Sequence, residues 1–163
     1  MWLLKEQPSG QRVDPPLSEG FLFPDSDIPR DTIQAYLETH YHVRGNAPTT
    51  LKIGETNATL AVLHRAADVE CSAFVTACNP FSVEQPADVN AARQQELARV
   101  LAQRGLTTID GLGEHPTNGW DGEASFLALG LALDDAIQVG KQHGQNAIVW
   151  SGIDAMPQLI LLR

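Results

Sequence analysis

The chain has 163 residues, of which 43% are hydrophobic and 19% are charged, a balance typical of one globular domain with its own core. Its formal net charge is −9, and its 11 Lys and Arg residues are scattered from Lys5 to Arg163 without forming a run. Binding to a nucleic-acid backbone needs a basic surface that neutralises phosphates. The charge distribution therefore argues against that class of function.

We expect a cytoplasmic protein with no membrane-spanning segment. The apolar start at residues 2–4 is too short for a signal peptide, and no stretch approaches the roughly 20 apolar residues of a transmembrane helix. Cys71 and Cys78 are seven residues apart, so a continuous strand would direct them to opposite faces. We expect two free thiols, which suit a reducing compartment.

Residues 1–29 are predicted to form a Pro-rich N-terminal arm, and residues 30–163 a single domain. Proline fixes its own φ angle and lacks a backbone donor, so this segment should be extended. The prolines concerned are Pro8, Pro15, Pro16, Pro24 and Pro29.

The first half of the domain is expected to contain two helices and three strands. In chain order they are a helix over residues 31–40, strands over 41–43 and 49–53, a helix over 57–67 and a strand over 71–77. Asp31 is predicted to cap the first helix. The run from Cys71 to Ala77 is small and apolar, which suits a central strand covered on both faces.

The second half continues the alternation of helices and strands. It holds a helix over 87–104, a strand over 106–109, a Gly-rich loop over 111–122, a strand over 124–129, a helix from 134 that Gly144 ends, and strands over 147–150 and 158–162. Asp88 is predicted as an N-cap, and Gly105 ends that helix. The pattern indicates the α/β class, bordering on α+β, with a mixed sheet flanked by about four helices.

Several short segments occur together in a characteristic order and spacing. They are Ala35-Tyr36 with Thr39 and Tyr41, Leu51–Gly54, Ala73–Pro80, Asn90 with Arg93, Glu123–Phe126 and Gly144–Ala147. Over roughly residues 31–162 this combination resembles the bacterial domain-of-unknown-function family 3293. His143 departs from the pattern, because an aromatic residue usually precedes Gly-Gln-Asn. The resemblance implies a shared fold, and it implies no known activity, substrate or cofactor.

Three common enzyme motifs are disfavoured. Gly111-Leu112-Gly113 begins like a dinucleotide-binding loop, but Pro116 takes the place of the third glycine and no helix follows. Gly140-Lys141 lacks the hydroxyl residue and upstream glycine of a P-loop, and no Gly-x-Ser-x-Gly elbow exists. No cofactor is expected.

Isolated reactive side chains give weaker indications. Cys78 follows a strand, where nucleophiles can occur, but a small buried filler is the better interpretation. His40 and His42 would share one face of a strand, yet no further ligand completes a metal site, so none is predicted. Trp120, in the Gly-rich loop, is a candidate for lining a pocket or forming a lid.

Polar residues at the ends of expected elements form the main candidate site. The ligand-binding candidates are Asn79, Asn90, Arg93, Ser125, Gln145, Asn146 and Trp120, and Glu123 is the candidate catalytic residue. Arg93 near a helix N-terminus is a plausible anion holder. The alternative is that these side chains only satisfy backbone groups at turns and caps.

Two functions follow from this set. The first is a non-catalytic binding or accessory protein for a small polar or anionic ligand, or for a protein partner. The second is an enzyme acting on a phosphorylated or nucleotide-like molecule, with Glu123 as acid or base and Arg93 holding the anion. The oligomeric state does not follow from the sequence.

Overall fold

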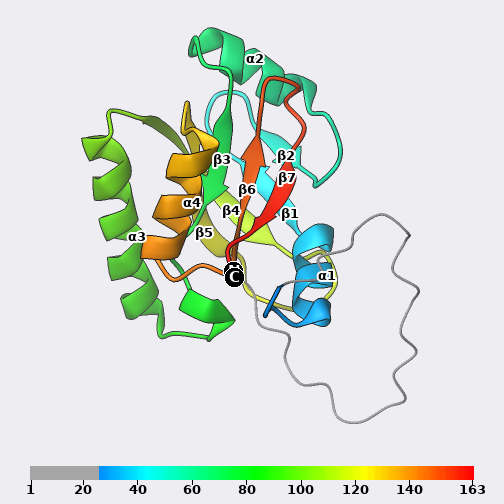
Figure 1. Cartoon of the computed structure of the whole chain (residues 1–163), viewed down its shortest axis with the longest axis vertical. Coiled ribbons are helices and arrows are strands. Elements are labelled where there is room, and N and C mark those ends of the chain that lie inside the picture. The colour runs from blue at the N-terminus through cyan, green and yellow to red at the C-terminus, as the bar shows by residue number, and fades with distance from the viewer. Residues whose placement is uncertain (1–25) are drawn as a thin grey trace.

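A seven-stranded sheet lies at the centre of the structure, a computed structural model that describes residues 26–163 (Figure 1). The helices are α1 (Arg30–Glu38), α2 (Ala58–Ala66), α3 (Ala87–Gln103) and α4 (Leu133–Gln142), and a 3-10 turn, η1, spans Pro80–Ser82. The strands are β1 (His40–Val43), β2 (Thr49–Leu51), β3 (Ser72–Val75), β4 (Thr107–Glu114), β5 (Glu123–Leu129), β6 (Ala147–Ser151) and β7 (Gln158–Leu161). The expected α/β domain with four helices is confirmed, whereas residues 1–25 of the predicted arm lie outside the described residues.

Neighbouring strands of the described sheet all run antiparallel, in the order β2-β1-β4-β5-β3-β6-β7. The alternation of strands with helices predicts a mixed sheet, and this prediction is wrong because every described strand pair is antiparallel. The helices do connect strands that point the same way. However, α3 crosses from β3 to β4 over β5, and α4 crosses from β5 to β6 over β3. Each crossover therefore skips one strand, and the skipped strand is antiparallel to both of its neighbours.

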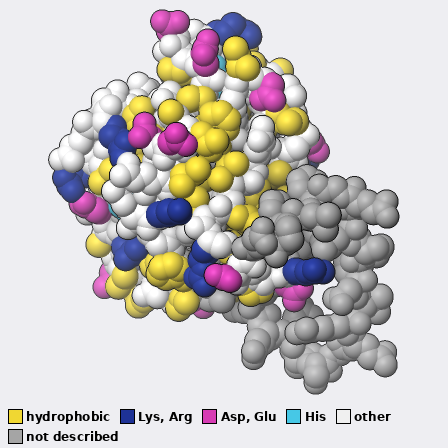
Figure 2. Space-filling view, in the orientation of Figure 1, with side chains coloured by type: hydrophobic (Ala, Val, Ile, Leu, Met, Phe, Trp, Pro, Cys, Tyr) yellow, Lys and Arg dark blue, Asp and Glu magenta, His cyan; other side chains and the backbone are white. Residues whose placement is uncertain are grey.

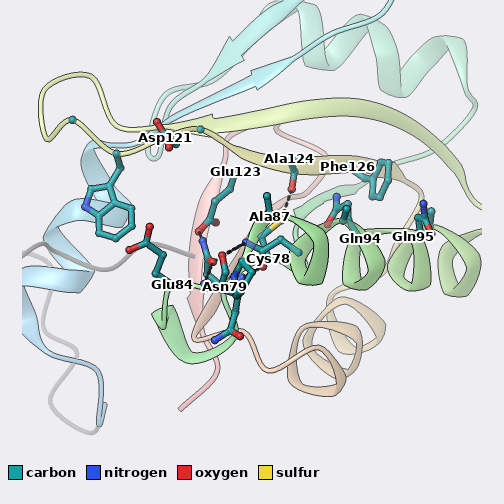
Figure 3. Close-up of a pocket in the computed structure, with 18 residues that line it drawn as sticks. Cys78, Asn79, Glu84, Ala87, Gln94, Gln95, Asp121, Glu123, Ala124 and Phe126 are labelled. Atoms are coloured by element: carbon teal, nitrogen blue, oxygen red, sulfur yellow. Dashed lines mark hydrogen bonds between the residues drawn. The ribbon is translucent and has the colours of Figure 1, made fainter.

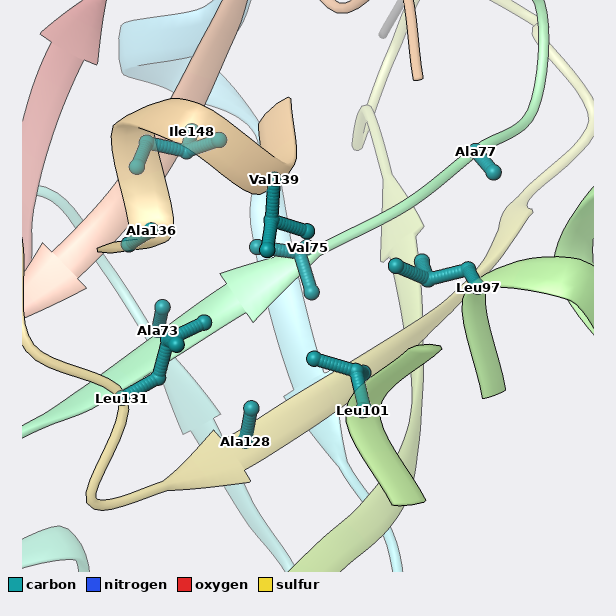
Figure 4. Packing of buried hydrophobic residues seen from close by; sticks show 10 residues of the cluster. All are labelled: Ala73, Val75, Ala77, Leu97, Leu101, Ala128, Leu131, Ala136, Val139 and Ile148. Carbon is teal, nitrogen blue, oxygen red and sulfur yellow. The ribbon is translucent and has the colours of Figure 1, made fainter. Parts of the chain in front are cut away.

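Helices cover both faces of the sheet, so its central strands are buried on both sides. On one face α3 and α4 pack over alternate residues of β3, β5 and β6, including Ala73, Ala128 and Ile148 (Figure 4). On the other face α2 packs over the intervening residues, which include Phe74, Leu127 and Val149. All four residues of β3 are buried, as predicted for a central strand.

Asp31 and Asp88 do not cap their helices as predicted. Each is the second residue of its helix, and Pro29 and Pro86 occupy the N-cap positions. The carboxylates lie in the first turn, where they favour the positive end of the helix dipole without capping it. By contrast, Asn57 caps α2, since its side chain accepts a 2.8 Å hydrogen bond from the backbone N–H of Leu60.

The predicted Gly-rich loop is shorter than expected, because β4 continues through Gly111-Leu112-Gly113 to Glu114. Gly111 pairs with Val43 of β1 and Ser125 of β5. A Cβ atom at Gly111 would lie 2.6 Å from the Phe74 ring and 2.8 Å from the carbonyl oxygen of His42. This glycine therefore allows close packing inside the sheet.

On the face seen in Figure 2, Lys and Arg side chains stand singly among Asp and Glu. Among the residues that the structure describes, no helix combines the length and apolar character needed to cross a bilayer.

We predict that Gly111→Ala lowers the free energy of unfolding by about 1–3 kcal/mol, because the new methyl group must displace Phe74 or strain the strand. Urea denaturation measures the change. Thr108→Ala, at an exposed position of the same strand, is the control and should change stability less. Equal stability of Gly111→Ala and the unchanged protein would contradict this account of the glycine.

We predict that the protein loses stability between pH 7 and pH 5, in part through His64. Burial lowers the pKa of His64 below its ordinary value of 6.5, and its Nε2 atom is 2.8 Å from Ser72 Oγ. As the pH falls through 6.5, the unfolded chain binds a proton that the folded protein does not, so stability decreases. Denaturation of His64→Gln across this range should show a shallower pH dependence, and Val62→Gln, exposed on the same helix, should not.

Candidate functional site

The segment that follows β3 is held by side chains. At Val75 the strand stops pairing with its neighbours, so the backbone groups of residues 76–79 need other partners. The N–H of Ala77 donates to Gln94 Oε1 at 3.0 Å, and the N–H of Asn79 donates to Asn90 Oδ1 at 2.9 Å. Both acceptors belong to α3, which is thereby fixed against the end of β3.

The carbonyl groups of the same segment are bound by Arg93 and Gln145. Arg93 donates from Nε to the Ala77 oxygen at 3.1 Å and from Nη2 to the His143 oxygen at 3.2 Å. Gln145 donates from Nε2 to the Cys78 oxygen at 3.1 Å. For these two residues the structure shows backbone-binding roles.

Asn79 is the junction at which the segment after β3 meets α3 and the start of β5. It adopts a left-handed conformation with φ of 46°, which asparagine tolerates better than most residues. Its Oδ1 accepts hydrogen bonds from Asn90 Nδ2 at 2.8 Å and from the Gln85 N–H at 2.9 Å. Its Nδ2 donates to Glu123 Oε1 at 2.8 Å. Asn79 thus connects β3, α3 and the buried carboxylate at the start of β5.

A pocket of about 770 Å³ lies beside this junction, between α3 and the start of β5 (Figure 3). We call it the α3–β5 pocket. Its lining is formed by Cys78, Asn79, Glu84, Gln85, Pro86, Ala87, Asn90, Ala91, Gln94, Gln95, Ala98, Gly119, Trp120, Asp121, Gly122, Glu123, Ala124 and Phe126. Four predicted residues therefore meet at one pocket: Asn79, Asn90, Trp120 and Glu123.

The other predicted residues do not line the α3–β5 pocket. Arg93 borders two smaller hollows, one with Glu96 and one with Lys141. Ser125 is buried, and its hydroxyl donates to the Glu123 carbonyl oxygen at 3.1 Å. Asn146 belongs to a separate buried cluster, where its Nδ2 donates to Ser82 Oγ at 3.0 Å.

That second cluster joins α1 to the η1 turn. The hydroxyl groups of Tyr36 and Ser82 are 2.6 Å apart, and Asn146 Nδ2 is 3.2 Å from the Tyr36 hydroxyl. Burial raises the pKa of Tyr36, so its phenol stays protonated at neutral pH. Phe81 and Ser82 both have positive φ angles, of 56° and 58°. The cluster holds this strained turn in place.

The geometry gives little support to a nucleophilic cysteine or to a metal site at the histidines. Cys71 and Cys78 are thiols rather than a disulfide pair, and burial raises the pKa of Cys78, which favours the unreactive thiol form. The rings of His40 and His42 are 6.0 Å apart, and His42 Nε2 is 3.3 Å from Glu114 Oε2. In the part of the chain that the structure describes, no three His, Cys, Asp or Glu side chains form a metal-binding group.

Among the pocket residues that the sequence analysis did not identify are Glu84, Asp121 and Gln94. The sequence pattern could have identified Gln94, because it lies on the same buried stripe of α3 as Leu97 and Leu101, where a polar residue is unusual. It is only 9% exposed, and its Nε2 atom has no hydrogen-bond partner among the described residues. Glu84 and Asp121 are exposed loop residues with no distinguishing pattern.

Comparisons with known proteins agree with the resemblance seen in the sequence. No curated protein and no solved structure matches the chain. Residues 75–148, which run from the end of β3 into β6, match the family described as Protein of unknown function (DUF3293), and the chain resembles that family over this segment.

Proposed function

We propose that the protein is a non-catalytic binding protein that takes a small polar molecule into the α3–β5 pocket. The observation that carries the proposal is the pocket itself. Its volume of about 770 Å³ falls within the 300–1,000 Å³ typical of small-molecule sites. Side-chain amides and carboxylates line it together with apolar groups such as Phe126 and Ala98, the usual composition of such sites.

A small ligand fits this geometry better than a protein partner. Protein interfaces of standard size bury about 800 Å² on each partner and are mostly broad surfaces. The polar groups here instead converge in a hollow beside α3, where Figure 3 shows side chains from both walls. We further propose that the protein acts in the bacterial cytoplasm, since two cysteines held as thiols suit a reducing compartment.

Catalysis is the second candidate, and one observation favours it. Glu123 is only 4% exposed, lines the pocket and accepts a hydrogen bond from Asn79, as a positioned acid or base would. The anion-holding role proposed for Arg93 has no such support, because Arg93 does not line the pocket and donates to two backbone carbonyls. Binding is therefore the better-supported function.

A thermal-shift screen with amines, amino acids, sugars, nucleosides and phosphorylated compounds tests the proposal. At 100 times its dissociation constant, a ligand stabilises the fold by about 2.7 kcal/mol, which raises Tm by roughly 5–10 °C. Ala91→Trp should abolish this shift, because Ala91 lines the pocket from an exposed position on α3.

Ala102→Trp is the matched control, since Ala102 is exposed on the same helix and does not line the pocket. This variant should keep the full ligand-dependent shift. The proposal is overturned if no compound stabilises the unchanged protein, or if Ala91→Trp and Ala102→Trp respond alike.

A further inference from the structure

The η1 turn and the residue after it place apolar side chains on the surface of the protein. Phe81 is 55% exposed and Val83 is 52% exposed, and with Pro80 they line an open hollow of about 470 Å³ beside the end of α4. Figure 2 shows hydrophobic side chains on the surface at the lower end of α4, with Lys and Arg side chains beside them. We call the surface formed by Pro80, Phe81, Val83 and Lys141 the η1 surface.

The backbone conformation that exposes Phe81 is an unfavourable one. Phe81 and Ser82 have φ angles of 56° and 58°, in the left-handed region that residues with a Cβ atom rarely adopt. Burial of Phe81 does not offset this strain, because more than half of the residue is exposed. Instead, Ser82 Oγ lies 2.6 Å from the Tyr36 hydroxyl and accepts a 3.0 Å hydrogen bond from Asn146 Nδ2. These buried contacts hold the turn so that it presents an aromatic side chain to the solvent, and strained residues held in this way cluster at functional sites.

The η1 surface is locally basic although the chain as a whole is acidic. Lys141 and Arg93 line its hollow, and the guanidinium carbon of a third cation, Arg163, lies 5.4 Å from the centre of the exposed aromatic ring. No Asp or Glu is among the described residues that line this hollow, and the neighbouring Glu84 lines the α3–β5 pocket instead. Charges more than about 8 Å away are largely screened at physiological ionic strength. A molecule in contact with the η1 surface therefore experiences these three cations more strongly than the distant carboxylates of the chain.

An extended acidic peptide suits the η1 surface better than a small molecule or a second copy of this chain. Small-molecule sites enclose their ligands and bury roughly 70–90% of the ligand surface. Phe81 and Val83 instead project from an exposed turn, where a small molecule would stay mostly in water. A two-fold dimer through this surface would bring the cations of both copies together. A peptide can place an apolar side chain on the turn and a carboxylate beside Lys141 at the same time.

We propose that the η1 surface docks an acidic segment of a partner protein that carries an aromatic or large aliphatic side chain. That side chain packs on Phe81 and Val83, and the carboxylates that flank it pair with Lys141 and Arg163. Because the buried contacts of Ser82 already hold the turn, docking requires little ordering of this chain. The docking function is additional to ligand binding in the α3–β5 pocket and does not depend on it.

A matched series of peptides tests the chemistry of the partner. The first probe is Gly-Glu-Asp-Phe-Glu-Glu-Gly with blocked ends, the second has Ala in place of Phe, and the third has Lys in place of every acidic residue. Titrations of the full chain followed by ¹H–¹⁵N NMR detect even millimolar affinities. The first peptide should shift the backbone signals of Phe81, Val83 and Lys141. The other two should bind about ten-fold more weakly or not at all, because each lacks one half of the interaction.

Two pairs of variants test the residues of the η1 surface. Phe81→Gly removes the ring, and glycine suits the φ angle of 56°, so this variant should fold and bind the first peptide about ten-fold more weakly. Ile153→Gly removes an apolar side chain that is 81% exposed in another turn, and it should bind as the unchanged protein does. Lys141→Gln should also weaken binding, whereas Lys52→Gln, which removes an exposed charge outside the hollow, should not.

The chain itself contains a competing segment, which the experiment must distinguish from a partner. Residues 19–25 include two carboxylates and two phenylalanines, and they directly precede Ser26, whose Oγ donates to the Arg163 carbonyl oxygen at 2.7 Å. The full-length double variant Phe21→Ala, Phe23→Ala removes the aromatic side chains of that segment. If the first peptide binds this variant ten-fold more tightly than the unchanged protein, the occupant is the chain's own segment and the partner proposal is overturned. Equal binding supports an external partner.

The remaining outcomes also decide the proposal. It is overturned if the first peptide binds neither the unchanged protein nor the double variant, or if the Ala or Lys peptide binds as tightly as the first. It also fails if Phe81→Gly and Ile153→Gly bind the first peptide alike. Ligand binding in the α3–β5 pocket is tested separately by the thermal-shift screen, so either function can fail while the other stands.

Discussion

The backbone of residues 76–79 sets the arrangement of everything around the candidate site. Once β3 ends at Val75, the N–H and C=O groups of this segment stand near the sheet without strand partners, and leaving them unpaired would cost about 1–3 kcal/mol each. Side chains of α3 and of the segment before β6 bind them instead. These hydrogen bonds to the backbone fix α3 in position. In that position α3 forms one wall of the pocket.

The antiparallel sheet explains why polar residues from distant parts of the chain meet there. Because β5 and β6 both run opposite to β3, their first residues lie at the same edge as its last residues. Glu123 at the start of β5 therefore reaches Asn79, which follows β3, although 44 positions separate them. In a parallel arrangement the start of β5 would lie at the opposite edge of the sheet.

Local sequence patterns predict the positions of the helices and strands well. They do not predict which strands are neighbours in the sheet. Apolar spacing and the glycines at 105 and 144 located α3 and α4 to within a few residues, because helix ends depend on nearby chain. Strand order depends on which strand each crossover skips, and no local residue encodes that choice. For the same reason, the sequence identifies Asn79 and Glu123 as polar residues at strand ends. It does not show that Arg93, unlike them, lies outside the pocket. An arginine that binds backbone carbonyls and one that holds a ligand occupy the same place on a helix.

Gln94 shows where stability stops being a sufficient explanation. Its Oε1 atom has a structural task, because without it the buried N–H of Ala77 would lose its acceptor. A glutamate in the protonated form would perform that task, and so would a small polar residue with a bound water molecule. The Nε2 atom performs no such task among the described residues, and burying it unpaired opposes folding. Buried polar groups in native proteins almost always have partners, and stability alone does not account for this one.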